Sequence, residues 1–172
     1  MFGESFLVET PSTDPDTIVG RNVIVPVAQL TGDKTKQHMR VTFKATDVKD
    51  KQVNTAFNGL DIIKEFIYRG VRKYTEKVEA VYTVKTKDNW QLQITTVAIL
   101  NRNSKFKLKT KVSKVILDVL QREAEKVDID QFVKSVIGGE YQKAIRKEGN
   151  KVYPLRFAEI SKIEVQKAGV AG

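Results

Sequence analysis

Cysteine is absent from this 172-residue chain, and histidine occurs only once. Without cysteine the chain forms no disulfide, thiolate zinc site or cysteine nucleophile, which excludes disulfide-rich secreted scaffolds, zinc ribbons and CxxC redox proteins. The longest purely apolar run, residues 97–100, is far shorter than the roughly 20 residues of a transmembrane helix. The first residues lack the basic region and apolar stretch of a secretory signal. We therefore expect a soluble protein.

Acidic residues are scarce in one part of the chain. The sequence holds 30 Lys and Arg against 21 Asp and Glu, a formal net charge of +9. The first 33 residues carry one base, Arg21, and five acids, so the rest of the chain supplies the whole positive surplus. Six bases fall between Arg102 and Lys114, and no acid lies between Asp88 and Asp118. Because a solvated surface normally mixes both signs, this block indicates binding to a polyanion.

Apolar periodicity predicts the secondary structure. Strands are expected over residues 23–25, 38–45, 52–57, 78–86, 90–100 and 156–167. Helices are expected over residues 62–74, 115–127, 129–137 and 141–149. The third strand is predicted to end at the turn signal Asn58-Gly59, and the first helix to begin after an N-cap at Asp61. Asp128 and Gln131 match a capping box for the third helix.

The order of these elements predicts the fold class. Strands and helices do not alternate as βαβ units, so we expect an α+β fold. Its sheet should be mostly antiparallel, curved or barrel-like, and packed with about three to four helices. We assign residues 1–20 to an extended acidic N-terminal segment, 21–167 to a single α+β domain and 168–172 to a short tail.

Groups that could support catalysis are few. The sequence has no phosphate-binding glycine motif and no HExxH motif. His38 is expected on the polar face of a strand, and the sequence suggests no neighbouring residue that would orient its proton for catalysis. The carboxylate pairs Asp14/Asp16, Asp47/Asp50 and Asp128/Asp130 lie in predicted loops, strand ends and a helix cap. We therefore predict no enzyme, no cofactor and no metal site.

The basic block offers a specific way to bind nucleic acid. Residues 105–111 alternate lysine with Phe106, Leu108 and Thr110. In an extended chain this alternation places the lysines on one face, about 7 Å apart, where they can meet successive phosphates. Further bases lie near the end of the first predicted helix and beside the turn at 87–89, namely Arg69, Arg72, Lys73, Lys77, Lys85 and Lys87. Trp90 either stacks on a base or packs in the sheet.

Six short strings occur in a characteristic order along the chain. They are Thr46-Asp47-Val48, Asn54-Thr55-Ala56-Phe57-Asn58-Gly59-Leu60-Asp61, Val71-Arg72-Lys73-Tyr74, Val84-Lys85-Thr86-Lys87-Asp88-Asn89-Trp90, Val152-Tyr153-Pro154-Leu155 and Ile163-Glu164-Val165. With them the chain resembles the archaeal and eukaryotic small-subunit ribosomal protein family S3Ae, also called eS1, from about residue 20 to residue 167. The chain's short termini favour an archaeal member.

The resemblance implies a structural protein on the platform of the small ribosomal subunit, near the exit of messenger RNA. Its implied partners are small-subunit ribosomal RNA, neighbouring platform proteins and messenger RNA at the exit, in the cytoplasm. The resemblance locates the segments, and their charge suggests the RNA contacts. We expect these at Arg72, Lys73, Lys85, Lys87, Arg102, Lys105, Lys107, Lys109, Lys111 and Lys114.

The N-terminal segment departs from the family pattern and supports an alternative. Family members usually carry a basic extension before the Phe-Gly that stands here as Phe2-Gly3, so we expect fewer RNA contacts from this chain. In the alternative, the acidic residues 1–33 form a protein-interaction module for a basic partner. Deleting them would then abolish partner binding and leave RNA binding intact.

Overall fold

The structure is a computed structural model that describes residues 18–49, 52–102, 104 and 106–169. The chain forms two compact units, Met1–Asp61 and Ile62–Gly172. Most of the predicted acidic segment lies outside the described residues, and the assignment of 21–167 to one domain stays a prediction. None of the helices in the described ranges is long and apolar enough to cross a membrane.

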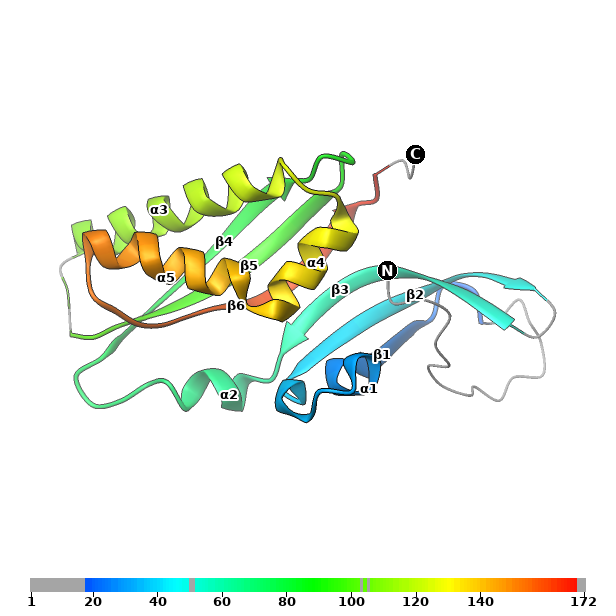
Figure 1. Ribbon diagram of the computed structural model, residues 1–172, viewed down its shortest axis with the longest axis horizontal. Helices are drawn as coiled ribbons and strands as arrows, with labels where there is room; N and C mark the ends of the chain where they lie inside the picture. The colour runs from blue at the N-terminus through cyan, green and yellow to red at the C-terminus, as the bar shows by residue number, and fades with distance from the viewer. Residues whose placement is uncertain (1–17, 50–51, 103, 105, 170–172) are drawn as a thin grey trace. The chain divides into compact units, whose positions relative to one another are not determined.

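The first unit contains three strands in the order β1-β2-β3. Strands β1 and β2 are antiparallel, with Ile24 opposite Thr42. Met39, Val41 and Phe43 are buried, as the alternation in the sequence predicts. The elements of this unit are β1 (Asn22–Pro26), α1 (Val27–Thr31), the 3-10 helix η2 (Lys34–Lys36), β2 (Met39–Lys49) and β3 (Gln52–Ile62) (Figure 1).

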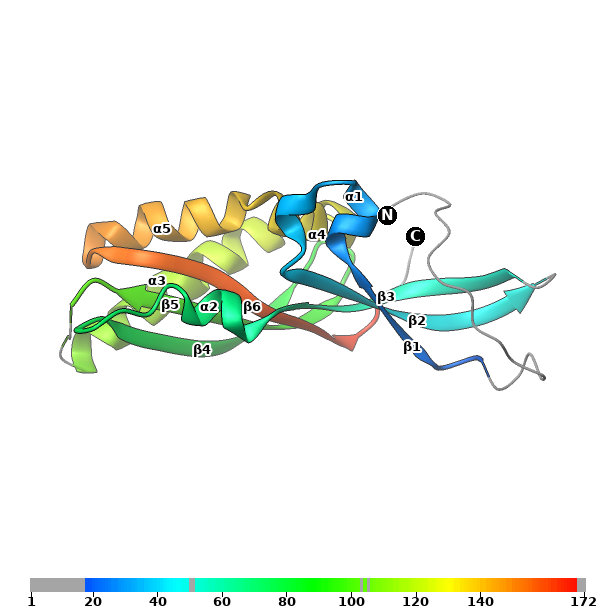
Figure 2. The ribbon, with the colours of Figure 1, turned by 90° about the horizontal axis from the view of Figure 1, so that it is seen from below.

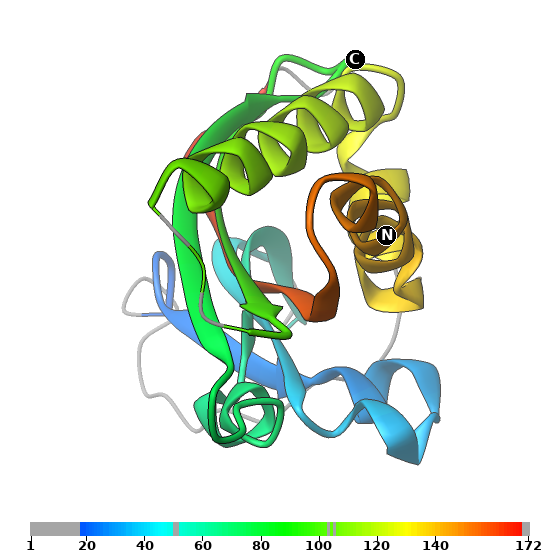
Figure 3. The ribbon, with the colours of Figure 1, turned by 90° about the vertical axis from the view of Figure 1, so that its left-hand side faces the viewer.

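The second unit is a three-stranded antiparallel layer, in the order β6-β5-β4, with helices on one face. Figure 3 shows α3, α4 and α5 covering that face. Leu92 and Ile94 of β5 are fully buried in the core, together with Ile116 and Leu120 of α3. The elements are α2 (Lys64–Tyr68), β4 (Glu76–Lys85), β5 (Gln91–Leu100), α3 (Phe106–Ala124), α4 (Ile129–Gly138), α5 (Glu140–Val152) and β6 (Leu155–Lys167).

The α+β class and the antiparallel pairing are confirmed. Neither set of described strands closes on itself, so the barrel-like form of the sheet is not seen. The described residues form five α-helices, where about three to four were expected. The additional helix is α1, whose five residues lie between strands where periodicity gives little signal.

The extended segment predicted over 105–111 is wrong. Helix α3 begins at Phe106, nine residues before the predicted start. Val112, Ile116, Leu120 and Ala124 are all buried and recur every four residues, so the helical stripe begins within the lysine block. Lysine is a good helix former, and packing of this stripe favours helix over the alternating pattern.

The predicted N-cap at Asp61 is also wrong. Strand β3 continues through Asn58 and Gly59 to Ile62, and α2 begins only at Lys64. Leu60 and Ile62 are buried and Asp61 is exposed, a period of two that fits a strand. Burial of alternate side chains therefore outweighs the local turn and cap signals here.

The predicted hairpin at residues 78–100 is confirmed. Val84 pairs with Leu92 across β4 and β5, and Asn89 adopts a φ of 60° in the turn. The expected capping box is not formed: Asp128 precedes α4 without a side-chain cap. Instead a carboxylate oxygen of Asp88 accepts a hydrogen bond from the backbone N–H of Ile129 at 3.3 Å. A residue distant in sequence therefore caps this helix.

Candidate nucleic-acid interface

Two basic segments lie at one end of the second unit. The segment between α2 and β4 leads to Glu76, whose carboxylate pairs with Lys109 of α3 and accepts a hydrogen bond from Ser104 N–H at 2.9 Å. Figure 1 shows the α2–β4 connection and the start of α3 at the same end of β4 but apart from each other, and Figure 2 shows this end from below. We call this surface the basic end. Its cations are Arg69, Arg72, Lys73, Lys77, Arg102, Lys107, Lys109, Lys111 and Lys114.

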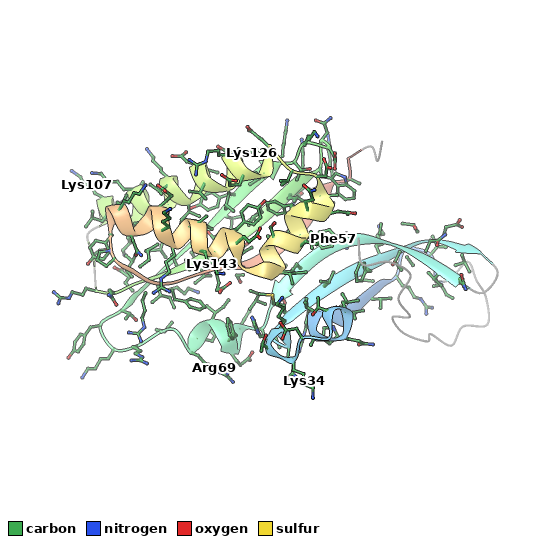
Figure 4. All side chains as sticks on the ribbon, in the orientation of Figure 1. Lys34, Phe57, Arg69, Lys107, Lys126 and Lys143 are labelled. Atoms are coloured by element: carbon green, nitrogen blue, oxygen red, sulfur yellow. The ribbon has the colours of Figure 1, made fainter. Side chains whose placement is uncertain are left out.

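The helical conformation divides the lysines of α3 between two sides. Successive residues of an α-helix are turned by about 100°. Lys107, Lys111 and Lys114 therefore share one side, and all three are exposed. Lys109 lies on the opposite side and pairs with Glu76 of β4. Figure 4 labels Lys107 at the start of α3. Three of the predicted lysines thus form an exposed face, and one has a structural partner.

The start of α3 carries lysines at a position where helices usually favour acidic residues. The N-terminal end of a helix carries a partial positive charge and favours acids. The first turn of α3 contains no acid. Glu76 offsets part of this charge, because the hydrogen bonds from Lys109 and from the Ser104 N–H lower the pKa of its carboxyl group. An anionic partner would offset the remainder.

The α2–β4 connection is held in a defined turn. Thr75 N–H donates to the carbonyl of Arg72 at 3.1 Å. The Thr75 hydroxyl donates to the same carbonyl at 2.6 Å and accepts from Arg72 N–H at 2.9 Å. Close packing at Gly70 anchors the turn, since a Cβ there would lie 2.8 Å from Ile99 Cδ1 and 3.3 Å from Phe157 Cγ. Arg72 and Lys73 are therefore presented on a fixed, exposed loop.

Most cations of the basic end form no ion pair within the described residues. Lys77 pairs with Glu79 at 2.6 Å and Lys109 with Glu76. The others form no ion pair with a carboxylate in the described part of the chain; they are Arg69, which Figure 4 labels beside α2, and Arg72, Lys73, Arg102, Lys107, Lys111 and Lys114. The basic end thus carries a surplus of exposed positive charge.

Lys85 and Lys87 lie at the other end of β4. Strand β4 spans ten residues from Glu76 to Lys85, about 30 Å of extended chain. Lys87 N–H donates to the carbonyl of Val127 at 3.3 Å, which places the hairpin turn beside the end of α3. We call this surface the hairpin end and assign to it Lys85, Lys87, Asp88, Asn89, Arg122, Glu123 and Lys126.

The remaining residues considered in the sequence analysis belong to neither end as described. The predicted Lys105 lies outside the described residues. Trp90 is half-buried, and a Cβ on Gly169 would lie 2.5 Å from Trp90 Cδ1, so its ring packs against the chain. The ring Nδ1 of His38 lies 3.1 Å from the carbonyl oxygen of Thr35, and desolvation lowers its pKa. Among the described residues, no group of three His, Asp or Glu is placed to hold a metal ion.

Sequence reasoning missed two features. Tyr68 and Tyr74 are 59% and 75% exposed within the basic end; the interleaving of aromatic and basic residues in residues 68–74 was the available signal. A cavity of about 250 Å³ is lined by residues of α5 and β6, among them Lys143 and Glu159. Figure 4 labels Lys143 on α5. Desolvation there raises the pKa of Glu159 to about 7. No local pattern in the sequence indicates this burial.

Comparisons with a family profile and with individual proteins identify the same family. The profile of the family described as Ribosomal S3Ae matches residues 1–169. A small ribosomal subunit protein eS1 from Sulfolobus acidocaldarius is 34% identical over 98% of this chain and 86% of its own length. The eS1 protein of Pyrobaculum islandicum is 35% identical over 96% and 74%, respectively. That of Methanobrevibacter smithii is 30% identical over 95% and 85%.

Proposed function

Because this chain belongs to the Ribosomal S3Ae family, we propose that it is a structural protein of the small ribosomal subunit that binds ribosomal RNA. In this proposal it acts on the platform of the subunit, near the exit of messenger RNA, as part of the cytoplasmic ribosome. Its role is to bind and position RNA rather than to catalyse a reaction. The names of its relatives support the ribosomal assignment.

One observation carries the assignment to RNA. Lys107, Lys111 and Lys114 form an exposed face of α3 that no described carboxylate neutralises. At 1.5 Å of rise per residue, this face extends about 10 Å along the helix. Lysines that contact phosphates along this face would displace the counterions of the RNA, and the release of those counterions favours binding.

The binding is expected to depend on shape and charge. Lysine and arginine contacts to phosphates fix register and orientation but do not read sequence. Folded RNA presents closely spaced phosphates, which an array of cations on a rigid helix and a fixed turn can recognise by geometry. Arg72 and Lys73 on the turn and Arg102 before α3 are the further exposed cations of the basic end.

The other predicted contacts remain part of the proposal. Lys85 and Lys87 would make a second, smaller RNA contact at the hairpin end, because about 30 Å of strand separates them from the basic end. Lys105 stays a predicted RNA contact, and Lys109 contributes to the basic end mainly by pairing with Glu76. Neighbouring platform proteins and messenger RNA near the exit are the further partners.

Co-sedimentation with small ribosomal subunits tests the proposal. Tagged protein is mixed with small subunits of Sulfolobus acidocaldarius that lack their own eS1 protein, and the mixture is run through a sucrose gradient. We expect the tagged chain in the subunit fraction, and release of the chain when the salt concentration is raised. A chain that stays at the top of the gradient at low salt would contradict the proposal. A control variant carries Lys34→Gln, which changes an exposed lysine of the first unit that belongs to neither end.

A further inference from the structure

An exposed tyrosine occupies an unusual position in the turn of the α2–β4 connection. Tyr74 is 75% exposed and has a φ of 68°. The hydrogen bond from Thr75 N–H to the Arg72 carbonyl makes Tyr74 the third residue of a four-residue turn. A positive φ at this position normally selects glycine or asparagine, and a bulky residue there is a genuine outlier.

Neither packing nor turn chemistry accounts for the tyrosine. A ring that is three-quarters exposed contributes little to the core, and its backbone conformation is strained. Strained residues of this kind cluster at active sites, ligand clamps and switch regions. The Thr75 hydroxyl, bonded to both backbone groups of Arg72, fixes the turn that presents this ring.

The surroundings of the ring favour a nucleotide. The Lys73 ammonium lies 5.2 Å from the centroid of the Tyr74 ring. Arg72 precedes it, and neither cation forms an ion pair with a described carboxylate. Tyr68 is a second exposed ring, with the Lys77 ammonium 6.0 Å from its centroid. Aromatic rings interleaved with cations are the usual means of binding unpaired nucleic acid, through base stacking and phosphate contacts.

We propose that the α2–β4 connection binds an unpaired nucleotide of ribosomal RNA, with its base stacked on Tyr74 and its phosphate held by Arg72 and Lys73. The inference rests on the proposed function and specifies its ligand at this loop. In this proposal, two parts of the basic end bind RNA in different ways. The α3 face contacts phosphates whether the RNA is paired or unpaired, whereas the Tyr74 ring contributes only where a base is unstacked.

Tyr74→Gly is an informative test variant. Glycine adopts a positive φ at no steric cost, so the turn should be retained while the ring is removed. Thermal unfolding checks that the fold is unchanged. Tyr74→Phe keeps the stacking surface, and Val81→Ala is the matched control because Val81 is 54% exposed and lies on β4 outside the basic end.

The probe is a short single-stranded RNA that contains one 2-aminopurine, compared with a duplex RNA of equal length. We expect wild-type protein and Tyr74→Phe to quench the 2-aminopurine emission on binding. We expect Tyr74→Gly to abolish the quenching, to weaken single-strand binding about tenfold and to leave duplex binding and the salt dependence unchanged. Val81→Ala should behave as wild type.

The outcomes separate this inference from the proposed function. If Tyr74→Gly binds and quenches as wild type does, the stacking site is refuted while salt-dependent RNA binding stands. If the wild-type chain shows no salt-dependent RNA binding, both proposals fail. Ultraviolet crosslinking in small subunits distinguishes the source of the nucleotide. We expect a crosslink from Tyr74 to ribosomal RNA in subunits freed of messenger RNA; a crosslink to protein, or one that needs messenger RNA, would overturn the assignment.

Discussion

The two ends of β4 differ in how their charges are balanced. At the hairpin end, Glu123 pairs with Arg122 and with Lys126, each at 3.2 Å, and Asp88 caps α4. At the basic end, most cations have no described acidic partner, and Glu76 is bound to Lys109. Both ends are exposed and rich in lysine. The comparison shows that lysine content alone does not identify an RNA surface, because the local acids decide how much charge remains for a partner.

The two ends also differ in which residue type adopts an unusual backbone conformation. Each end has one non-glycine residue with a positive φ, Asn89 in the hairpin and Tyr74 in the α2–β4 turn. Asparagine is a common residue in this conformation and suits a hairpin turn. Tyrosine is not. The hairpin therefore follows ordinary turn chemistry, and the basic end departs from it where we place a ligand.

Neutralising the α3 face should have the largest effect on RNA binding. We expect the combined change of Lys107, Lys111 and Lys114 to glutamine to weaken binding roughly a hundredfold at 0.1 M salt, because three phosphate contacts are lost. Fluorescence anisotropy with a labelled duplex RNA measures the affinity. Glutamine is also a good helix former, so α3 should persist.

The hairpin end supplies the matched comparison for that variant. Changing Lys85 and Lys87 to glutamine should weaken binding by less than about tenfold, since fewer phosphates are contacted there. If the hairpin pair costs as much affinity as the α3 triple, the distinction between the ends is wrong.

A buried acid should affect stability and not RNA binding. Burial raises the pKa of Glu159 from 4.5 to about 7. The folded state therefore binds a proton more tightly than the unfolded state, and this contribution to stability is present below pH 4.5 and is lost as the pH rises through about 7. A shift of this size corresponds to about 3 kcal/mol in the free energy of unfolding.

Glu159→Gln removes this titration. We expect the variant to unfold at higher denaturant concentration than wild type at pH 8, and at nearly the same concentration at pH 4. RNA affinity should be unchanged, because Glu159 lies beside α5 and belongs to neither end. Equal stability of the two proteins at pH 8 would show that the carboxyl group is not desolvated.

The smallest effect is expected for Asn89→Gly. Both residues tolerate a positive φ, so the free energy of unfolding should change by no more than about 0.5 kcal/mol. Single-strand RNA affinity should not change. Chemical denaturation and the 2-aminopurine assay measure the two quantities. A loss of RNA binding equal to that of Tyr74→Gly would mean that turn flexibility, rather than the tyrosine ring, governs binding.

Local pattern predicted the hairpin and failed at α3. The β4–β5 hairpin was predictable because alternating residues flank Asn89, and both signals are local. The lysine alternation at 105–111 was misleading, although the buried stripe that continues back to Val112 was present in the sequence. The cap of α4 by Asp88 was not predictable, since the two residues are distant along the chain.

The candidate site shows the same limit. The cations themselves could be chosen from the sequence, because a block without acids is visible in composition. Their grouping into two ends could not, since it depends on the contact between Glu76 and Lys109 and on the length of β4. The positive φ of Tyr74 likewise follows from the turn that Thr75 stabilises. The residue types in this segment do not predict that turn.

The salt dependence of RNA binding tests the central claim most directly. The slope of log K against log salt concentration is measured for wild type, for the α3 triple variant and for the hairpin pair. We predict that the triple variant reduces the magnitude of the slope by about two to three, one unit or slightly less for each phosphate contact removed, and that the hairpin pair reduces it less. A triple variant with the slope of wild type would contradict the assignment of the basic end to RNA.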